Sequence, residues 1–253
     1  MPEVTAHAPG NFCWVELATT DDAAAKRFYT ELFGWTTNEI PMGEEGGMMY
    51  IMLQKDGKDV GALYKMMPDQ QMPPNWQTYV ATDDIDNVAE KAKSLGGNVV
   101  AGPFDVYDSG RMAVVADPAG AMFGLWQAKE HIGYRVKDES GSVCWSELTA
   151  PDLDAARKFY GGLFGWTWKE SPEYTEWQHG GQSIGGAMQP KHEGMPPHWM
   201  PYFAVDDADT IVAKAKSLGA SVYVEPTDIP NVGRFAVVAD PQGAAFAIIK
   251  LAY

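Results

Sequence analysis

An internal repeat limits the fold of this 253-residue sequence more than any other feature. Residues 12–35 (FCWVELATTDDAAAKRFYTELFGW) match residues 143–166 (VCWSELTAPDLDAARKFYGGLFGW) at an offset of 131 residues. Farther along, PPNWQTYVATDD from Pro73 matches PPHWMPYFAVDD from Pro196 at an offset of 123. Self-similarity of this length indicates two copies of one structural unit.

The change of offset locates a length difference between the copies. Copy two is eight residues shorter somewhere after Trp166, and a hairpin loop such as the Met42–Gly47 region of copy one is the natural place for it. The segment HIGYRVKDESGS, which begins at His131, is polar and carries Gly and Ser. We therefore predict one domain over residues 8–130 and a second over residues 140–253.

Each copy divides again into two halves of the same order, a strand, a helix and three strands. In the first helix Ala25, Phe28 and Leu32 recur at helical spacing and predict one buried stripe. Asp21 is expected to cap its start and Gly34 its end. For copy one we predict strands at 12–18, 35–40, 48–53, 60–66, 76–81, 98–106, 112–116 and 122–127, and a second helix with Ile85, Val88, Ala92 and Leu95 buried.

The order βαβββ-βαβββ, the helix ending in F-Y-x-x-L-F-G-W and the D-P-x-G turn at Asp117 and Asp240 resemble the glyoxalase/bleomycin-resistance (vicinal-oxygen-chelate) superfamily. The resemblance covers residues 11–127 and 142–251. It implies an α+β fold of four βαβββ modules that form two glyoxalase-like domains with cupped mixed sheets. It also implies that the copies pack about an approximate two-fold axis, as an intramolecular pseudo-dimer, with a homodimer of chains as a further possibility.

The resemblance is informative about metal binding because metal-dependent members place four ligands at fixed positions. Among the residues at those positions, only Gln77 could ligate a metal, so we expect a lost metal site and no cofactor. His179, His192 and His198 are interpreted as solvated loop residues. The ligand positions fall on Trp14, Gly61–Ala62, Gln77 and Gly124 in copy one, and on Trp145, Gly185–Gly186, Met200 and Ala247 in copy two.

Strand alternation predicts which side chains face the cup. In the first strand Trp14 and Glu16 point to one face, whereas Cys13 and its apolar neighbours point to the other. The apolar face should lie against the helices, so Trp14 and Glu16 face the cup. The predicted ligand-binding side chains are Trp14, Gln77, Tyr79 and Trp126 in copy one, and Trp145, Met200 and Tyr202 in copy two.

Glu16 and its copy-two equivalent Glu147 are the candidate catalytic residues. A carboxylate in a partly apolar cup has a raised pKa and could act as a general base. Alternatively, each carboxylate is a structural or ligand-anchoring group paired with an arginine. Arg111 and Arg234 are the candidate partners and join the predicted ligand-binding set.

Composition excludes some classes of partner. The formal charge of -15 is unsuited to nucleic acid, and no apolar run approaches the length of a bilayer span. No secretion signal is evident, and Cys13 and Cys144 are expected to be small buried strand residues. We therefore expect a cytoplasmic protein with a small-molecule ligand or substrate.

Three functional hypotheses remain open. The first is a metal-independent binding protein, like the drug-binding bleomycin-resistance members that the resemblance brings in. The second is a lyase or isomerase of glyoxalase-like type that acts on a small carbonyl compound with Glu16 or Glu147 as the base. The third is a structural or interaction protein whose cups are filled by Trp14 and Trp145.

Overall fold

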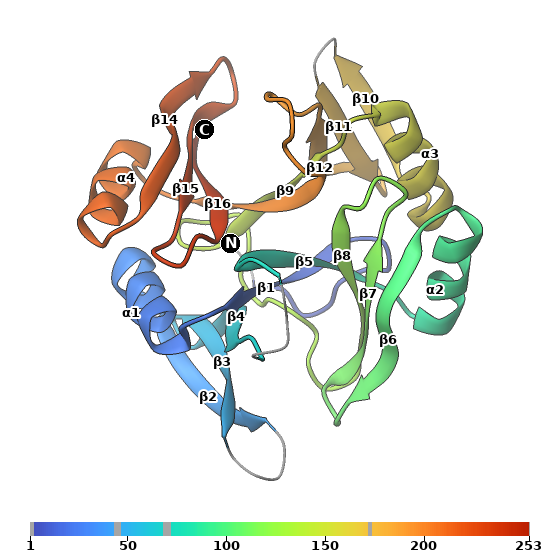
Figure 1. Ribbon diagram of the computed structural model, residues 1–253, viewed down its shortest axis with the longest axis horizontal. Coiled ribbons are helices and arrows are strands. Elements are labelled where there is room, and N and C mark those ends of the chain that lie inside the picture. Colours follow the sequence, from blue (N-terminus) through green and yellow to red (C-terminus); the bar gives the residue numbers. More distant parts are fainter. Residues whose placement is uncertain (1–2, 43–46, 68–71, 172–173, 253) are drawn as a thin grey trace.

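Each copy of the repeat forms one eight-stranded mixed sheet with two helices (Figure 1). The computed structural model describes residues 3–42, 47–67, 72–171 and 174–252. The elements of copy one are β1 (Phe12–Thr19), α1 (Asp22–Phe33), β2 (Thr36–Met42), β3 (Met48–Lys55), β4 (Lys58–Lys65), β5 (Asn75–Ala81), α2 (Ile85–Ser94), β6 (Asn98–Val106), β7 (Gly110–Ala116) and β8 (Met122–Ala128). Those of copy two are β9 (Val143–Thr149), α3 (Leu153–Phe164), β10 (Thr167–Ser171), β11 (Tyr174–His179), β12 (Gln182–Met188), β13 (His198–Ala204), α4 (Ala208–Ser217), β14 (Ser221–Ile229), β15 (Gly233–Ala239) and β16 (Ala245–Leu251).

The strand order shows how two βαβββ modules build each sheet. It is β2-β3-β4-β1-β5-β8-β7-β6 in copy one and β10-β11-β12-β9-β13-β16-β15-β14 in copy two. Within each module the first strand pairs parallel with the fourth, and the modules join where β1 meets β5 and β9 meets β13 antiparallel. Both sheets curl, and their concave faces point away from each other (Figure 1). The predicted α+β fold of four modules in two cupped domains is confirmed.

The first helix begins and ends where the sequence predicts, whereas in α2 the buried residues are Ile85, Ala89 and Ala92, and the predicted Val88 and Leu95 are only partly buried. Asp21 accepts a hydrogen bond from the Ala24 backbone N–H at the start of α1, and Gly34 ends the helix with a left-handed φ of 74°. Asp152 and Gly165 do the same for α3. The buried stripe of α1 consists of Ala25, Phe28, Tyr29 and Leu32.

The two copies share their hydrophobic cores, because α1 packs beside α4 and α2 beside α3 (Figure 1). One core joins α1 to Phe203 and Phe246 of copy two, and the other joins Phe123 of copy one to α3. The Tyr29 hydroxyl donates to Asp240 Oδ2 at 3.0 Å, and the Tyr160 hydroxyl donates to Asp117 Oδ2 at 3.1 Å. The tyrosine of the F-Y pair in α1 and in α3 thus donates a hydrogen bond to the D-P-x-G turn of the other copy.

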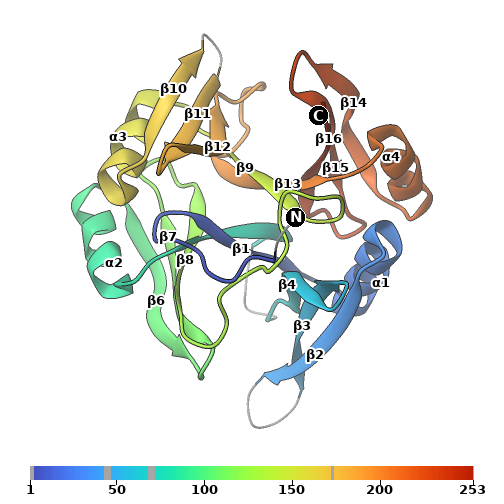
Figure 2. The same ribbon diagram turned by 180° about the vertical axis from the view of Figure 1, so that it is seen from behind.

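Figure 2 shows the segment after β8 running through the centre of the molecule beside the N-terminal residues. Tyr134 and Val136 in this segment are buried, and the Tyr134 backbone N–H donates to Cys13 O at 2.9 Å. The connection is therefore packed structure and not a plain polar spacer. The domain limits 8–130 and 140–253 stay a prediction.

The length difference between the copies falls in two places. Tyr50 and Tyr174 occupy equivalent positions at an offset of 124, compared with 131 before the hairpin. Most of the length difference therefore lies in the β2–β3 hairpin of copy one. The tip of that hairpin, residues 43–46, lies outside the described residues. The remaining residue is lost before β13, where the offset is 123.

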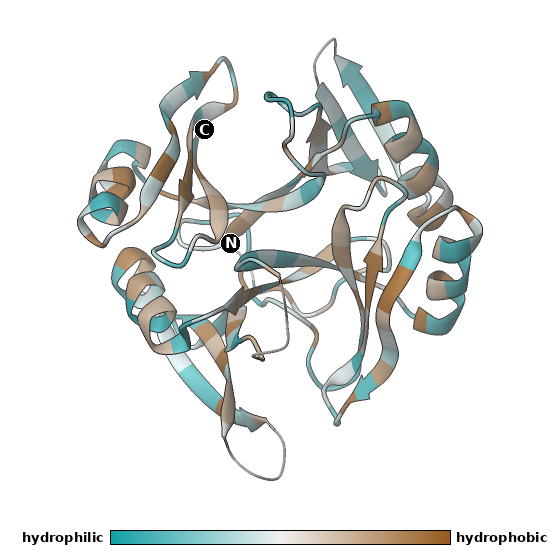
Figure 3. Ribbon diagram, viewed as in Figure 1, coloured by the Kyte–Doolittle hydropathy of each residue, from teal (hydrophilic) through white to brown (hydrophobic). Residues whose placement is uncertain are grey.

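The outer strand β2 is largely exposed and hydrophilic (Figure 3). Among the described helices, none is long and apolar enough to cross a membrane.

Candidate functional site

A chain of hydrogen bonds lies on the concave face of copy one. The Trp14 indole N–H donates to the Tyr50 hydroxyl at 3.0 Å, and that hydroxyl donates to Glu16 Oε2 at 2.7 Å. The Tyr79 hydroxyl donates to Glu16 Oε1 at 2.8 Å. Both oxygens of the Glu16 carboxylate are therefore held by phenols.

Copy two repeats this arrangement. The Trp145 indole N–H donates to the Tyr174 hydroxyl at 2.9 Å, which donates to Glu147 Oε2 at 2.9 Å. The Tyr202 hydroxyl donates to Glu147 Oε1 at 2.6 Å. We call these two sets cluster one (Trp14, Glu16, Tyr50 and Tyr79) and cluster two (Trp145, Glu147, Tyr174 and Tyr202).

Strand pairing explains how each cluster assembles. Trp14 and Glu16 lie two residues apart on β1 and so share a face, and β1 is opposite Tyr79 and Gln77 on β5. The prediction that the indole and the carboxylate share the concave face with Tyr79 agrees with these bonds. In cluster two, Tyr202 lies opposite Trp145 in the same way.

Burial sets the acidity of both carboxyl groups. Desolvation raises the pKa of Glu16 above its ordinary value, although the hydrogen bonds from Tyr50 and Tyr79 oppose the rise. The pKa of Glu147 is raised for the same reason, against the hydrogen bonds of Tyr202 and Tyr174 and the charges of Lys191 and His198. Each carboxyl group can therefore exchange a proton at a higher pH than an exposed glutamate.

At Gly124 and Gly186, two of the positions where the resemblance places metal ligands, a tyrosine occupies the space that a ligand side chain would need. A β-carbon added to Gly124 would overlap the Tyr79 ring, and one added to Gly186 would overlap the Tyr174 hydroxyl. A ligand side chain at either glycine would therefore displace a phenol of the cluster. Within the described ranges, no three His, Cys, Asp or Glu side chains come together as a metal centre requires. The residues present do not fit the metal of the superfamily.

The three copy-two histidines occupy separate local environments. His179 Nδ1 lies 2.9 Å from Asn11 Oδ1, at the contact between the copies, and His198 Nδ1 lies 2.8 Å from Pro196 O. His192 is exposed in the turn after β12. His192 lies in a loop, as predicted. His179 and His198 do not, because His179 ends β11 and His198 begins β13.

Cluster one is covered by the segment that follows β8. The His131 ring meets the Trp14 ring edge-on with a centroid distance of 4.6 Å, and His131 O accepts the Trp126 indole N–H at 2.8 Å. The exposed fractions of Trp14, Tyr79 and Trp126 are only 4%, 3% and 8%. The side-chain nitrogens Gln77 Nε2 and His131 Nε2 are buried without a hydrogen-bond partner among the described residues.

Cluster two is more exposed at its indole, because Trp145 is partly exposed whereas Trp14 is buried. The glutamate and the first tyrosine are partly exposed in both clusters (Glu16 and Tyr50, Glu147 and Tyr174), and Tyr79 and Tyr202 are buried. Ile249 stands at the position of Trp126 and Met200 at that of Gln77. Trp145 belongs to a small apolar group whose other members are Cys144, Met200, Tyr202, Phe235, Val237, Ala247, Ile249 and Leu251.

The predicted pairing of each glutamate with an arginine is wrong. Arg111 donates to both carboxylate oxygens of Asp86 in the first turn of α2, and Arg234 does so to Asp209 in the first turn of α4. The reason is strand alternation, because Arg111 shares a face of β7 with Ala113 and Val115, which pack toward the helices. The arginines therefore lie on the opposite face from the clusters.

The sequence interpretation missed three members of these sites. Tyr50 and Tyr174 became alignable only once the shortened hairpin was placed, although each lies in a strand with the expected alternation. His131 lies in a segment whose polar composition predicts a domain boundary. No signal in the sequence alone indicates that the segment after β8 folds back onto Trp14.

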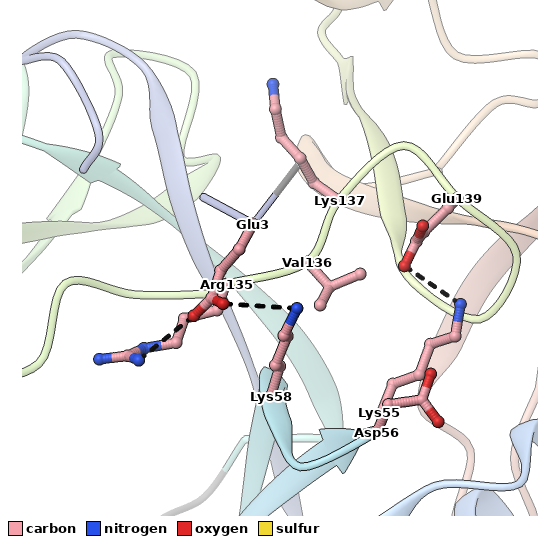
Figure 4. A pocket seen from close by; sticks show the side chains of 8 residues that line it. All are labelled: Glu3, Lys55, Asp56, Lys58, Arg135, Val136, Lys137 and Glu139. Carbon is pink, nitrogen blue, oxygen red and sulfur yellow. Dashed lines mark hydrogen bonds and ion pairs between the residues drawn. The ribbon is translucent and has the colours of Figure 1, made fainter. Parts of the chain in front are cut away.

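Two surface hollows lie outside both clusters. Figure 4 shows the first, of about 40 Å³, where Glu3 bridges Arg135 and Lys58 while Lys55 reaches Glu139. Its volume suits water and not an organic ligand. The second, of about 240 Å³, lies between Phe28 on α1 and Leu218 after α4.

Comparison with known sequences decides the family. The sequence model described as "Glyoxalase/Bleomycin resistance protein/Dioxygenase superfamily" matches residues 12–125 and 131–248. The chain belongs to this superfamily. It is 44% identical to "Putative glyoxylase CFP32" of Mycobacterium tuberculosis over 257 residues, which cover 99% of this chain and 98% of that protein. It is 38% identical to "Anthracycline biosynthesis protein DnrV" of Streptomyces peucetius over 266 residues, covering 98% and 96%.

Solved structures of the superfamily show the same fold at low identity. A Mn(II)-bound glyoxalase from Novosphingobium aromaticivorans superposes with a TM-score of 0.66 at 15% identity, covering 96% of this chain and 82% of that one. A homoprotocatechuate 2,3-dioxygenase from Brevibacterium fuscum gives a TM-score of 0.68 at 17% identity, covering 100% and 84%. These neighbours establish the fold and leave the activity of this chain open.

Proposed function

We propose that this superfamily member is a metal-independent binding protein for a flat, oxygenated aromatic molecule, and that the ligand binds at cluster two. The observation that carries the proposal is the partly exposed Trp145 indole beside the Glu147 carboxyl group, which two phenols hold in place. The predicted binding role of cluster one is not part of this proposal, because His131 covers Trp14.

The face around Trp145 suits a planar ligand. An indole offers a broad π surface on which an aromatic ring stacks favourably, and Phe235, Ile249 and Met200 add apolar area beside it. Small-molecule sites typically combine such an apolar lining with a few fixed polar groups. Here the fixed polar group is Glu147.

Glu147 can recognise either a hydroxyl or a carbonyl group of the ligand. Each carboxylate oxygen already accepts one phenol hydrogen bond and retains a second lone pair for a ligand hydroxyl. When protonated, the group can instead donate to a ligand carbonyl, and the raised pKa of Glu147 makes this form more accessible. Its two phenol contacts fix the carboxyl group before the ligand arrives, which reduces the entropic cost of binding.

The relatives support an aromatic ligand. DnrV and DauV of Streptomyces are both named for anthracycline biosynthesis and match this chain over nearly its whole length. Anthracyclines are flat polycyclic compounds with hydroxyl and carbonyl groups. A ligand of that general class matches the stacking surface and the carboxyl group of cluster two.

A second candidate function is catalysis by Glu147 as a general base. The raised pKa of Glu147 favours it, because a base that is matched to the working pH transfers protons efficiently. The reaction would be proton abstraction next to a carbonyl group, as in a lyase or isomerase of glyoxalase-like type. Binding without turnover would leave Glu147 as an anchor.

Fluorescence titration with 1,8-dihydroxyanthraquinone tests the proposal on protein dialysed against EDTA. We expect quenching of tryptophan fluorescence and saturable binding, and Trp145→Ala should weaken it by about ten- to a hundredfold, since a stacked indole contributes about 1–3 kcal/mol. Glu147→Gln retains the shape of the side chain and should weaken binding less.

The matched variant Glu16→Gln is the control, because it makes the same change in cluster one. The proposal fails if the dialysed wild-type protein does not bind the probe, or if binding requires a stoichiometric transition metal by elemental analysis. Turnover of a bound hydroxyketone that Glu147→Gln abolishes would favour the enzymatic candidate.

A further inference from the structure

Basic side chains lie beside cluster two and have no counterpart at the equivalent strand position of cluster one. The loop between β12 and β13 rises into the space between β11 and β14 (Figure 1). Lys191 belongs to this loop, and His198 is the first residue of β13.

His198 is placed on the ligand face by strand register. It lies opposite Thr149 of β9, while Met200 lies opposite Glu147 and Tyr202 opposite Trp145. Residues 198, 200 and 202 alternate along β13 and therefore share one face. His198 is thus the next side chain along the row that contains Met200 and Tyr202.

The hydrogen bonding of His198 leaves one ring nitrogen for a ligand. Pro196 O can only accept, so His198 Nδ1 carries the proton in the 2.8 Å contact between them. Nε2 makes no hydrogen bond within the described part of the chain. A charged imidazolium carries a proton on this nitrogen as well and would donate it to an anion.

Lys191 is also available to contact a ligand. It is exposed and forms no ion pair within 4.0 Å in the described ranges. Its charge nevertheless reaches Glu147, because Lys191 and His198 both lower the pKa of that carboxyl group against the larger effect of desolvation. Glu147 forms no ion pair with Lys191 or His198 among the described residues, and its two oxygens accept hydrogen bonds from Tyr174 and Tyr202.

Copy one provides an internal comparison. Asn75 replaces His198 and makes the equivalent turn contact, from Asn75 Nδ2 to Pro73 O at 2.9 Å. The pKa of Glu16 responds to desolvation and to Tyr50 and Tyr79, with no basic group among its causes. The basic pair is therefore a property of copy two and not of the repeated fold.

We propose that Lys191 and His198 make the ligand site at cluster two selective for a flat aromatic molecule that carries a carboxylate. This inference rests on the proposed function, since it specifies the ligand of that site. The ring system would stack on Trp145, and the carboxylate would lie toward the start of β13. A protein with a net charge of -15 repels anions at long range, so a local basic pair is what would admit one.

A matched pair of probes tests this selectivity. Anthraquinone-2-carboxylate and anthraquinone-2-carboxamide have nearly the same shape and differ in charge. We expect the wild-type protein to bind the carboxylate about tenfold more tightly at low salt, as one partly exposed ion pair with a hydrogen bond would give, and the preference should shrink at high salt. The double variant Lys191→Gln/His198→Asn should bind both probes with the affinity of the amide.

Lys129→Gln is the control for net charge, because Lys129 pairs with Asp105 in copy one, away from the site. It should retain the preference, as should the conservative variant Lys191→Arg. Equal binding of the two probes by the wild-type protein would overturn the inference and leave the proposed function intact. Failure of both probes to bind would overturn the proposed function itself, and a preference that survives in the double variant would overturn the role of the two residues.

Discussion

Clusters one and two have the same polar framework in different surroundings. In each, an indole donates to a phenol and two phenols donate to the carboxylate of a glutamate. In copy one, His131 and Trp126 close over Trp14, whereas in copy two Trp145 remains partly exposed beside Ile249. The comparison teaches that a duplicated site can bury its indole in one copy while the equivalent indole keeps access to solvent in the other.

The largest expected effect is the cost of removing each indole. Trp14→Ala should lower the free energy of unfolding by about 3–5 kcal/mol, because Trp14 is 4% exposed and its loss leaves a cavity. Trp145→Ala should cost about 1–2 kcal/mol, since its side chain is already partly in water. Urea unfolding of both variants measures the difference. Equal losses would show that the two surroundings are energetically alike.

A smaller and symmetric effect is expected at the contact between the copies. Tyr29→Phe leaves the buried Asp240 carboxyl group and the Trp76 indole N–H without their shared hydroxyl. Tyr160→Phe does the same to Asp117 and Trp199. Each variant should lower the free energy of unfolding by about 1–3 kcal/mol in chemical denaturation, because it leaves two buried polar groups without a hydrogen-bond partner.

These two losses should agree more closely than those of the tryptophan variants. If they differ as widely, the asymmetry between the copies is not confined to the clusters.

The smallest expected effect is a pH dependence that belongs to copy one. Burial lowers the pKa of His131, so the unfolded chain binds a proton that the folded chain excludes. This contribution to stability is present above the unfolded pKa of about 6.5 and is lost as the pH falls below it. Glu16 and Glu147 act in the opposite direction, because their raised pKa values favour the folded state as the pH falls.

The difference between wild type and His131→Gln isolates the histidine. Urea midpoints of the wild-type protein should fall more steeply between pH 7 and pH 5 than those of the variant. Parallel curves would mean that His131 is not held neutral over Trp14.

Much of the fold follows from local rules that the sequence obeys in both copies. The caps at Asp21 and Gly34 and the stripe on α1 are local signals, and the repeat doubles the evidence for each. The orientation of Trp14 and Glu16 toward the concave face likewise follows from alternation along one strand. The Tyr50 partner of Glu16 could not be predicted, because Tyr50 comes from a strand beyond β4 and its register depends on a hairpin of variable length. Arg111 alternates with the buried Ala113 and Val115 on the helix side of β7, so the same alternation rule excludes it as a partner of Glu16.

A co-crystal structure with 1,8-dihydroxyanthraquinone tests the central claim most directly, because it locates the ligand. We predict one molecule per chain, stacked on Trp145, with a hydroxyl or carbonyl oxygen within hydrogen-bonding distance of the Glu147 carboxyl group. Trp14 should keep its edge-on contact with His131 in the same crystal. A ligand bound over Trp14, or in the hollow between Phe28 and Leu218 with cluster two unoccupied, would contradict the account.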